Sequence, residues 1–158
     1  MTKTLQAGDA APNFDLTGDA GPVTLTGFKG KTLVLYFYPK DDTSGCTAEA
    51  QAFTAAATDF AEAGAVIVGV SKDSVAKHAK FRAKYDLAPI LGSDPDGKAV
   101  EAYGVWVEKS LYGRKYMGIE RATFLIDASG KIRRVWRKVK VSGHAADVLA
   151  AVRLLGKV

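Results

Sequence analysis

The chain has 158 residues, 47% of them hydrophobic and 25% charged, which is ordinary for one globular domain and excludes a disordered or fibrous protein. A single cysteine and two histidines exclude an intrachain disulfide, a Cys-x-x-Cys pair and a cysteine-rich or histidine-rich metal centre, so we expect no metal and no other cofactor. The net charge of +5 is local, because six basic residues lie within Lys131–Lys140 and the rest of the chain has 16 basic against 17 acidic residues. This argues against a general nucleic-acid-binding surface.

Strand and helix patterns alternate in the first half of the chain. Phe14–Thr17 and Val23–Thr26 predict two short strands around a turn that contains glycine and proline. The apolar run Leu33–Tyr38 predicts a strand that is buried on both faces, and Pro39 ends it. After a polar loop, apolar residues recur at helical spacing over Thr47–Glu62 and predict a helix.

The second half continues this alternation and ends with a hairpin and a helix. Ala65–Val70 predicts a second buried strand, and Ser71–Ser74 can cap a helix that follows it. The remaining predicted elements are a short strand at Pro89–Leu91, a short helix at Lys98–Tyr103, two hairpin strands at Ala122–Asp127 and Ile132–Val139, and an amphipathic helix at His144–Leu155.

This order of elements predicts the fold class. Strands that alternate with helices require crossover connections and give a mostly parallel sheet, to which the late hairpin adds antiparallel strands. We therefore expect a single α/β domain over residues 1–158 with a thioredoxin-like fold. Its central mixed β-sheet is flanked by helices on both faces and has an N-terminal β-hairpin extension.

No segment has the pattern of a targeting or membrane-spanning sequence. Residues Met1–Gln6 lack the apolar core of a secretory signal, and the longest apolar runs are far shorter than the roughly 20 residues of a membrane span. We expect a cytoplasmic protein with no membrane partner, in a compartment where a lone thiol stays reduced.

Cys46 lies where the predicted buried strand gives way to the predicted helix. Free cysteines are often buried structural residues with apolar neighbours, whereas Cys46 follows the polar loop Lys40–Gly45. The start of a helix has unpaired backbone N–H groups and a partial positive charge, and both stabilise a thiolate. The context therefore favours a reactive thiol over a structural one.

The sequence around Cys46 resembles the peroxiredoxin signature Pro-x-x-x-Thr-x-x-Cys, which Pro39–Cys46 matches. The run Lys-Asp-Asp-Thr-x-Gly-Cys-Thr is most similar to the bacterioferritin-comigratory-protein, or PrxQ, branch of that family. Four further segments follow in the order that this branch has: Gly69–Asp73, Asp94–Gly97, Tyr103–Val105 and Gly118–Asp127. The resemblance extends from about Gly8 to Leu155 and covers nearly the whole chain.

The resemblance implies a peroxidase in which the Cys46 thiolate attacks one peroxide oxygen and becomes a sulfenic acid. Thr43 is implied to accept a hydrogen bond from the peroxide and to donate one to the thiolate. Arg121 is implied to stabilise the thiolate and the developing negative charge. The backbone N–H groups of Gly45 and Cys46 are implied to bind the substrate, and Pro39 to shape the loop and shield it from water.

Each of these positions also has a simpler explanation. Thr43 can be the N-cap of the helix, Pro39 can merely end a strand, and Arg121 can be an exposed strand residue, so only their joint pattern favours the catalytic roles. Glu49, one turn into the helix, is either a surface acid that the helix dipole favours or, by resemblance, a residue that orients Arg121.

Other conspicuous residues are assigned structural roles. Tyr38 and Trp106 are expected to pack rather than to catalyse. His78 lies among lysines and an arginine in a predicted helix and is expected on the surface, and His144 is expected to begin the last helix. Neither histidine is placed to act as a general base.

The chain departs from many members of the PrxQ branch because it lacks a second, resolving cysteine. One usual position is occupied by Gln51, and the other lies in the predicted helix Val75–Lys84, which contains no cysteine. The count indicates a one-Cys enzyme whose sulfenic acid is reduced by an external thiol, either thioredoxin, glutaredoxin or a small thiol. Ser44 also stands where proline is common, which leaves the loop polar but less rigid.

A peroxide and an external thiol are thus the expected partners, and we expect a monomer or a weak homodimer. Two other functions stay open: a thiol-transfer module on the same fold, and a non-catalytic redox-binding module. The basic run Lys131–Lys140 is interpreted as a solvated edge strand, with a docking strip for an acidic partner as the alternative and nucleic-acid binding as a weaker third.

Overall fold

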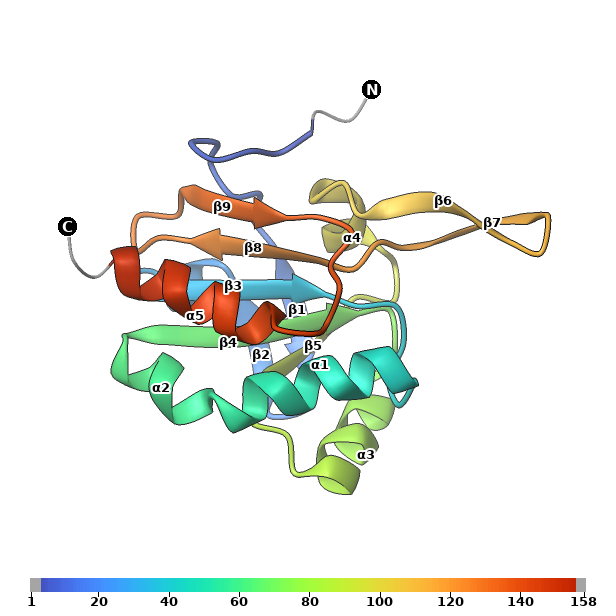
Figure 1. Cartoon of the computed structure of the whole chain (residues 1–158), viewed down its shortest axis with the longest axis horizontal. Helices are drawn as coiled ribbons and strands as arrows, with labels where there is room; N and C mark the ends of the chain where they lie inside the picture. Colours follow the sequence, from blue (N-terminus) through green and yellow to red (C-terminus); the bar gives the residue numbers. More distant parts are fainter. Residues whose placement is uncertain (1–3, 156–158) are drawn as a thin grey trace.

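A seven-stranded mixed sheet runs through the protein (Figure 1), and the computed structural model describes residues 4–155. The strands of this sheet are β1 (Asp15–Gly18), β2 (Gly21–Thr24), β3 (Thr32–Phe37), β4 (Ala65–Ser71), β5 (Ile90–Ser93), β8 (Ala122–Ile126) and β9 (Ile132–Trp136). Their spatial order is β2-β1-β5-β4-β3-β8-β9. Strands β3, β4 and β5 are parallel, whereas β1, β2, β8 and β9 pair in the antiparallel sense, so the predicted mixed sheet is confirmed.

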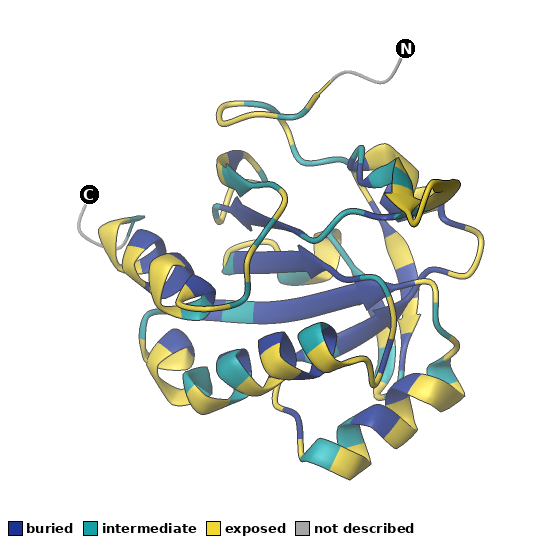
Figure 2. Ribbon diagram, turned by 45° about the vertical axis from the view of Figure 1, so that its right-hand side comes forward, coloured by how far each residue is buried: buried dark blue, intermediate teal, exposed yellow. Residues whose placement is uncertain are grey.

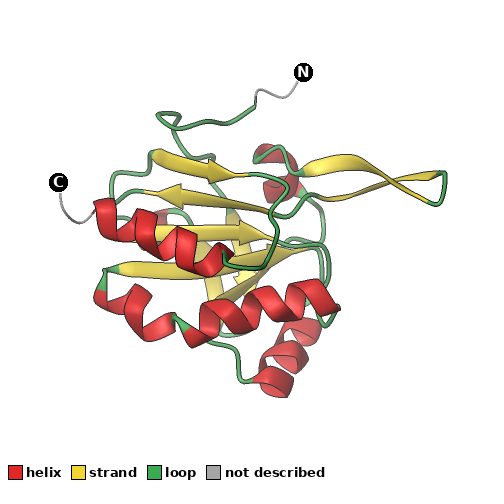
Figure 3. Cartoon of the chain, in the orientation of Figure 1, coloured by secondary structure: helices red, strands yellow, loops and turns green. Residues whose placement is uncertain are grey.

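Helices cover both faces of this sheet (Figure 3). They are η1 (Thr26–Phe28), α1 (Ser44–Ala55), α2 (Ala57–Glu62), α3 (Val75–Tyr85), α4 (Lys98–Ala102) and α5 (His144–Leu155). Alternate residues of β3 enter two separate hydrophobic clusters: Leu35 packs in one with Val100 of α4, and Tyr36 packs in the other with Phe53 of α1. Burial on both faces, visible in Figure 2, explains why β3 is a continuous apolar run.

The N-terminal hairpin of β1 and β2 is confirmed, and it joins the main sheet. Thr17 of β1 lies opposite Ser93 of β5, so β2 forms one edge of the sheet and β9 the other. The last helix α5 has the predicted bounds, with Val148 and Val152 buried against the sheet. None of the helices within residues 4–155 is long and apolar enough to cross a bilayer.

The helix predicted over Thr47–Glu62 is wrong in its extent. The structure has two helices there, α1 and α2, which meet at Ala56, where φ is −97° and ψ is 5°. These angles fall between the helical and extended regions and interrupt the first helix. Helix α1 also begins three residues earlier, at Ser44, because the polar and small residues of its first turn carry no apolar periodicity. Cys46 therefore lies inside the first turn of α1.

A second, two-stranded sheet was absent from the sequence prediction. It consists of β6 (Trp106–Leu111) and β7 (Arg114–Ile119), joined at Tyr112 and Gly113, where φ is 52° and 78°. Two successive left-handed residues are typical of a tight hairpin turn, but Asn-Gly or Asp-Gly marks such a turn far more clearly in a sequence. This hairpin extends away from the main sheet (Figure 1).

Candidate active site

Cys46 lies just beyond the carboxyl end of the central strand β3, in the first turn of α1. Its thiol is free, and only 2% of the residue is exposed. The N–H of Thr47 donates to the carbonyl of Thr43 at 2.8 Å and closes the first turn of the helix. The N–H groups of Ser44, Gly45 and Cys46 therefore have no acceptor within α1. Together with the helix dipole they create a positive potential at the start of the helix, where the sulfur lies.

Arg121 approaches this thiol from the loop directly before β8. The antiparallel pairing of β3 with β8 sets Phe37 opposite Ala122, which brings Arg121 beside the end of β3. Its Nη2 donates to Cys46 Sγ at 3.3 Å, and its Nη1 donates to Glu49 Oε1 at 2.7 Å. Its side chain is 16% exposed, so it is not an exposed strand residue. Burial disfavours the guanidinium charge, but Glu49 and Cys46 outweigh this effect, and the pKa of Arg121 is raised.

The two residues before Cys46 fit this arrangement in different ways. A Cβ atom at Gly45 would lie 3.0 Å from Arg121 Nη2, so a larger residue there would push the guanidinium away from the sulfur. The sequence alone gives no signal of this close contact. Ser44 is the first residue of α1, a position where proline is favoured because its missing N–H is not needed. Serine at this position is thus compatible with the same helix start.

Glu49 is buried beneath Arg121, with 1% of the residue exposed. Burial raises the pKa of Glu49 to about 7, because it outweighs the opposing effect of the Arg121 guanidinium. Its Oε2 atom has no hydrogen-bond partner among the described residues. The structure therefore makes Glu49 a buried acid in contact with Arg121 rather than a surface residue, and its charge changes near neutral pH.

Thr43 and Pro39 border the loop that precedes Cys46. Thr43 occupies the N-cap position of α1, but its side chain makes no capping hydrogen bond. Its Oγ1 instead donates to the carbonyl of Lys40 at 2.8 Å, so the hydroxyl proton is directed at the loop backbone and not at Cys46, contrary to the implied donation to the thiolate. The lone pairs of Oγ1 can still accept a hydrogen bond. Thr43 is exposed and Pro39 is half-buried, which leaves this side of the loop open to a small molecule.

His78 is fully buried, so its predicted surface position is wrong. Its Nδ1 lies 2.7 Å from Asp41 Oδ2, and its Nε2 lies 3.0 Å from the carbonyl of Gly92, which can only accept. Tyr38 packs in the core as predicted, and its hydroxyl also donates to Asp41 Oδ1 at 2.6 Å. The basic residues near His78 in the sequence lie on other faces of α3. His78 and Phe81 are three residues apart, so both lie on the buried face of this helix.

A second set of contacts links the same loop to α3. Asp42 has a left-handed backbone, with φ of 60°. Its Oδ2 accepts from Lys84 Nζ at 2.8 Å and its Oδ1 from the Tyr85 hydroxyl at 2.6 Å, and these bonds lower the pKa of Asp42. The N–H of Asp41 donates to Asp73 Oδ2 at 2.8 Å. The loop before Cys46 is thus fixed to α3 from two sides.

The other sequence-predicted residues lie away from Cys46 or support the core. His144 begins α5 as predicted; its Nε2 lies 2.8 Å from Thr123 Oγ1, and burial lowers the pKa of His144 to about 4. Trp106 is half-buried beneath Lys72, whose Nζ lies 4.3 Å from the ring centroid. The basic run follows the edge strand β9, where most of its residues are exposed, but Arg137 is half-buried and donates to a backbone carbonyl at 3.3 Å.

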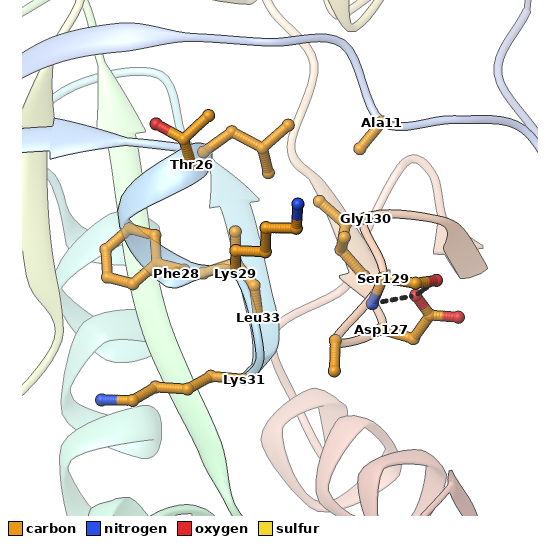
Figure 4. A pocket seen from close by; sticks show the side chains of 12 residues that line it. Ala11, Thr26, Phe28, Lys29, Lys31, Leu33, Asp127, Ser129 and Gly130 are labelled. Carbon is orange, nitrogen blue, oxygen red and sulfur yellow. Dashed lines mark hydrogen bonds between the residues drawn. The ribbon is translucent and has the colours of Figure 1, made fainter.

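A cavity of about 250 Å³ lies at the other end of the sheet (Figure 4). It is lined by residues such as Leu33 at the start of β3 and Asp127 after the end of β8, whereas Cys46 and Arg121 lie at the opposite ends of the same strands. Phe28, Lys29 and Lys31 border it, and no thiol or histidine lines it. The thiol of Cys46 and the guanidinium of Arg121 therefore lie at the carboxyl end of β3 and not at this cavity.

The chain is similar in sequence and in structure to proteins of one family. The sequence profile of the AhpC/TSA family matches residues 7–135. "Peroxiredoxin Bcp" of Bacillus subtilis is 50% identical over 151 residues, which cover 95% of this chain and 96% of that protein. A structure of the Xanthomonas campestris bacterioferritin comigratory protein, described with its alkyl peroxide reduction activity, superimposes with a TM-score of 0.87 at 42% identity and 99% coverage of both chains. A PrxQ mutant of Xylella fastidiosa gives a TM-score of 0.90 at 36% identity and 98% coverage of both.

Proposed function

The chain belongs to the AhpC/TSA family as a peroxiredoxin of the Bcp, or PrxQ, kind, and from this premise we propose how its own residues reduce a peroxide. It is a thiol-dependent peroxidase, and its substrates are hydroperoxides. The alkyl peroxide reduction activity described for the Xanthomonas campestris relative supports organic hydroperoxides as substrates beside hydrogen peroxide.

The first half-reaction takes place at Cys46. Its thiolate attacks one oxygen of the hydroperoxide, an S–O bond forms as the O–O bond breaks, and the leaving oxygen takes up a proton and departs as an alcohol or water. Sulfur loses two electrons and becomes a sulfenic acid. Arg121 and the free N–H groups of Gly45 and Cys46 stabilise the negative charge that spreads over sulfur and both oxygens. Each such donor contributes roughly 2.7–4 kcal/mol in comparable sites.

The neighbouring residues position these groups. Thr43 accepts a hydrogen bond from the peroxide, because its own proton is held by the carbonyl of Lys40. Pro39 shapes the loop and limits the access of water. Glu49 holds the second nitrogen of Arg121 and so fixes the direction of the guanidinium toward Cys46. A bidentate or two-partner arrangement of this kind is specific to arginine.

The second half-reaction requires another molecule, because Cys46 is the only cysteine of the chain. An external thiolate attacks the sulfenic sulfur, an S–S bond forms, and hydroxide leaves and takes up a proton to give water. A second thiol then breaks the mixed disulfide, which restores Cys46 and leaves the reductant oxidised. We take thioredoxin, glutaredoxin or a small thiol as the reductant, the cytoplasm as the compartment, and one domain that acts as a monomer or weak homodimer.

The contact of Arg121 with Cys46 at the start of a helix carries this proposal. Peroxide consumption with dithiothreitol as the reductant tests it, with Cys46→Ser as the comparison. The wild type is expected to consume peroxide and Cys46→Ser is expected to consume none above the background rate. Equal rates for both proteins would show that Cys46 is not the reacting group.

A further inference from the structure

The hairpin of β6 and β7 carries most of the large hydrophobic side chains that are exposed among the described residues. Of five large hydrophobic side chains that are exposed, four lie on it: Leu111, Tyr112, Tyr116 and Met117, which are 57%, 97%, 47% and 50% exposed. The hairpin stands apart from the main sheet (Figure 1), so no other part of the fold buries these residues. A concentration of exposed apolar side chains on one element is typical of a surface that binds another molecule.

The register of the hairpin separates its residues into two different faces. Paired residues of an antiparallel ribbon lie on the same face, and Leu111 pairs with Arg114, Lys109 with Tyr116, and Val107 with Gly118. One face, the apolar–cationic face, therefore consists of Val107, Lys109, Leu111, Arg114 and Tyr116. The other face has Met117 beside Glu108, which forms an ion pair with Lys115 at 3.6 Å. The apolar–cationic face thus has two cations and no acid, whereas the cation of the other face is paired.

The apolar–cationic face adjoins the active site. Burial and the Arg121 charge lower the pKa of Lys109, while the charges of Cys46 and Glu120 act on it in the opposite sense. Strand β7 also leads through Glu120 directly into Arg121. From Trp106 to its tip the hairpin spans about 20 Å, at roughly 3.3 Å per residue. A protein interface covers about 800 Å² on each partner, which is wide enough to extend from this face to the base of the hairpin beside Arg121.

We propose that the apolar–cationic face of the β6–β7 hairpin is the docking surface for a protein dithiol reductant whose exposed thiol is bordered by apolar side chains and carboxylates. This inference rests on the proposed function, which requires an external thiol for every turnover. Docking orients the attacking thiolate toward the sulfenic sulfur of Cys46, and the bonds that form and break are those of the second half-reaction described above.

The charges favour such a partner over a second copy of this chain. If two copies packed their apolar–cationic faces together, Lys109 and Arg114 of each would face the same cations of the other without any acid between them. Like charges in such positions oppose association. A partner with carboxylates around an apolar centre pairs with both cations, while Leu111 and Tyr116 supply the buried apolar contact that interfaces require.

Steady-state peroxide reduction tests the proposal, with three reductants compared: dithiothreitol, bacterial thioredoxin and glutaredoxin. The face is altered by Leu111→Ser with Tyr116→Ser, and separately by Arg114→Glu. The matched controls on the opposite face are Met117→Ser and Lys115→Glu. None of these residues belongs to the catalytic machinery, so the dithiothreitol-driven rate is expected to stay within twofold of wild type and also reports that each variant is folded.

With the protein reductant that sustains turnover, we expect kcat/KM to fall at least tenfold for both variants of the apolar–cationic face and less than twofold for the controls. The salt dependence of kcat/KM is expected to weaken in Arg114→Glu. Equal changes of kcat/KM for variants of both faces, or no change for either face, would overturn the proposed docking surface. Turnover with dithiothreitol but with neither thioredoxin nor glutaredoxin would also overturn it. The proposal would also be overturned if sedimentation showed a wild-type dimer, and if the variants of the apolar–cationic face dissociated this dimer without lowering kcat/KM. If the wild type did not reduce peroxide with dithiothreitol, the proposed function itself would be contradicted.

Discussion

Arg121 holds two acidic partners at once, with one nitrogen on Cys46 Sγ at 3.3 Å and another on Glu49 Oε1 at 2.7 Å. Gly45 leaves room for this geometry, because a Cβ atom there would lie 3.0 Å from Arg121 Nη2 and would force the guanidinium to shift. A fixed cation beside a thiolate both stabilises it before the reaction and stabilises the oxygen anion that leaves. At the scale of residues, the proposed site therefore brings one thiol, one cation and one buried acid into contact.

Arg121→Ala is expected to lower the second-order rate constant for oxidation by peroxide by about 10²–10³, which corresponds to the loss of one preorganised charge-stabilising donor. Arg121→Lys is expected to restore little of it, since an ammonium group cannot reproduce the two separate contacts. Stopped-flow single-turnover kinetics of the reduced protein measure this constant. Arg133→Ala, on the exposed edge strand, serves as the control, and an unchanged constant in Arg121→Ala would remove this residue from the mechanism.

Glu49 gives the protein a pH dependence of stability with a defined sign. In the unfolded chain its carboxyl ionises near pH 4.5, whereas in the folded protein burial raises the pKa to about 7. Between these values the unfolded state binds fewer protons, so the free energy of unfolding falls as pH rises, by about 3 kcal/mol in total. Glu49→Gln removes this contribution, so the variant is expected to gain stability relative to wild type between pH 5 and pH 8.

Urea unfolding of wild type and Glu49→Gln at both pH values measures the change. The comparison within the pair is needed because His144, with a pKa lowered to about 4, acts in an overlapping range with the opposite sign: its contribution is lost as pH falls below about 6.5. If the difference between the two proteins does not change between pH 5 and pH 8, Glu49 is ionised throughout this range.

At the scale of elements, the loop before Cys46 is fixed to helix α3 by buried and surface contacts. Asp41 pairs with His78 in the core, and Asp42 binds Lys84 and Tyr85 at the surface. Helix α3 is one of the two places where a resolving cysteine is found in the PrxQ branch, and this chain has none there. In this chain, polar contacts join the loop before Cys46 to helix α3, and none of these contacts involves the Cys46 sulfur.

His78→Ala is expected to lower the free energy of unfolding by about 3 kcal/mol, because it leaves Asp41 Oδ2 and the Gly92 carbonyl without their buried hydrogen-bond partner. Lys77→Ala, one residue away and exposed, is expected to stay within about 0.5 kcal/mol of wild type. Urea unfolding measures both values. The alkylation rate of Cys46 by iodoacetamide is expected to rise in His78→Ala only, and equal rates in the two variants would mean that the network does not hold the loop.

At the scale of the whole molecule, the two ends of the central strands have different roles. The carboxyl end of β3 and the start of β8 bring Cys46 and Arg121 together, while the other ends border a cavity without redox-active groups. Cys46 is the only thiol of the sequence, so it is the only residue that a peroxide can convert to a sulfenic acid. Without a second thiol nothing in the chain intercepts the sulfenic acid.

Excess peroxide without a thiol is expected to convert Cys46 to sulfinic and then sulfonic acid, which adds about 32 and about 48 Da to the intact mass. With dithiothreitol present during the exposure, the mass is expected to remain that of the reduced protein. Intact-mass spectrometry follows both conditions. Protein that stays unmodified under excess peroxide alone would argue against an accessible, reactive Cys46.

Much of this fold could be predicted because burial leaves strong patterns in the sequence. The two-sided burial of β3 appears as five successive apolar residues, and the inward face of α5 appears as a helical period. The β6–β7 hairpin could not be predicted in this way, since it buries little and its charges interrupt the alternation. The site was predictable around Cys46 through its motif, whereas the burial of His78 and the space left by Gly45 depend on contacts between distant segments.

Because only 2% of Cys46 is exposed, the two half-reactions make different demands on access to its sulfur. A hydroperoxide is small enough to enter beside the loop, but a protein thiol must bring its sulfur to about 2 Å from Sγ to form a disulfide. A protein thiol must therefore displace the groups that cover Sγ, and local openings of this kind take microseconds to seconds in proteins. We expect the frequency of that opening to limit turnover with a protein reductant, so that a variant with a looser loop is reduced faster by the protein thiol than wild type.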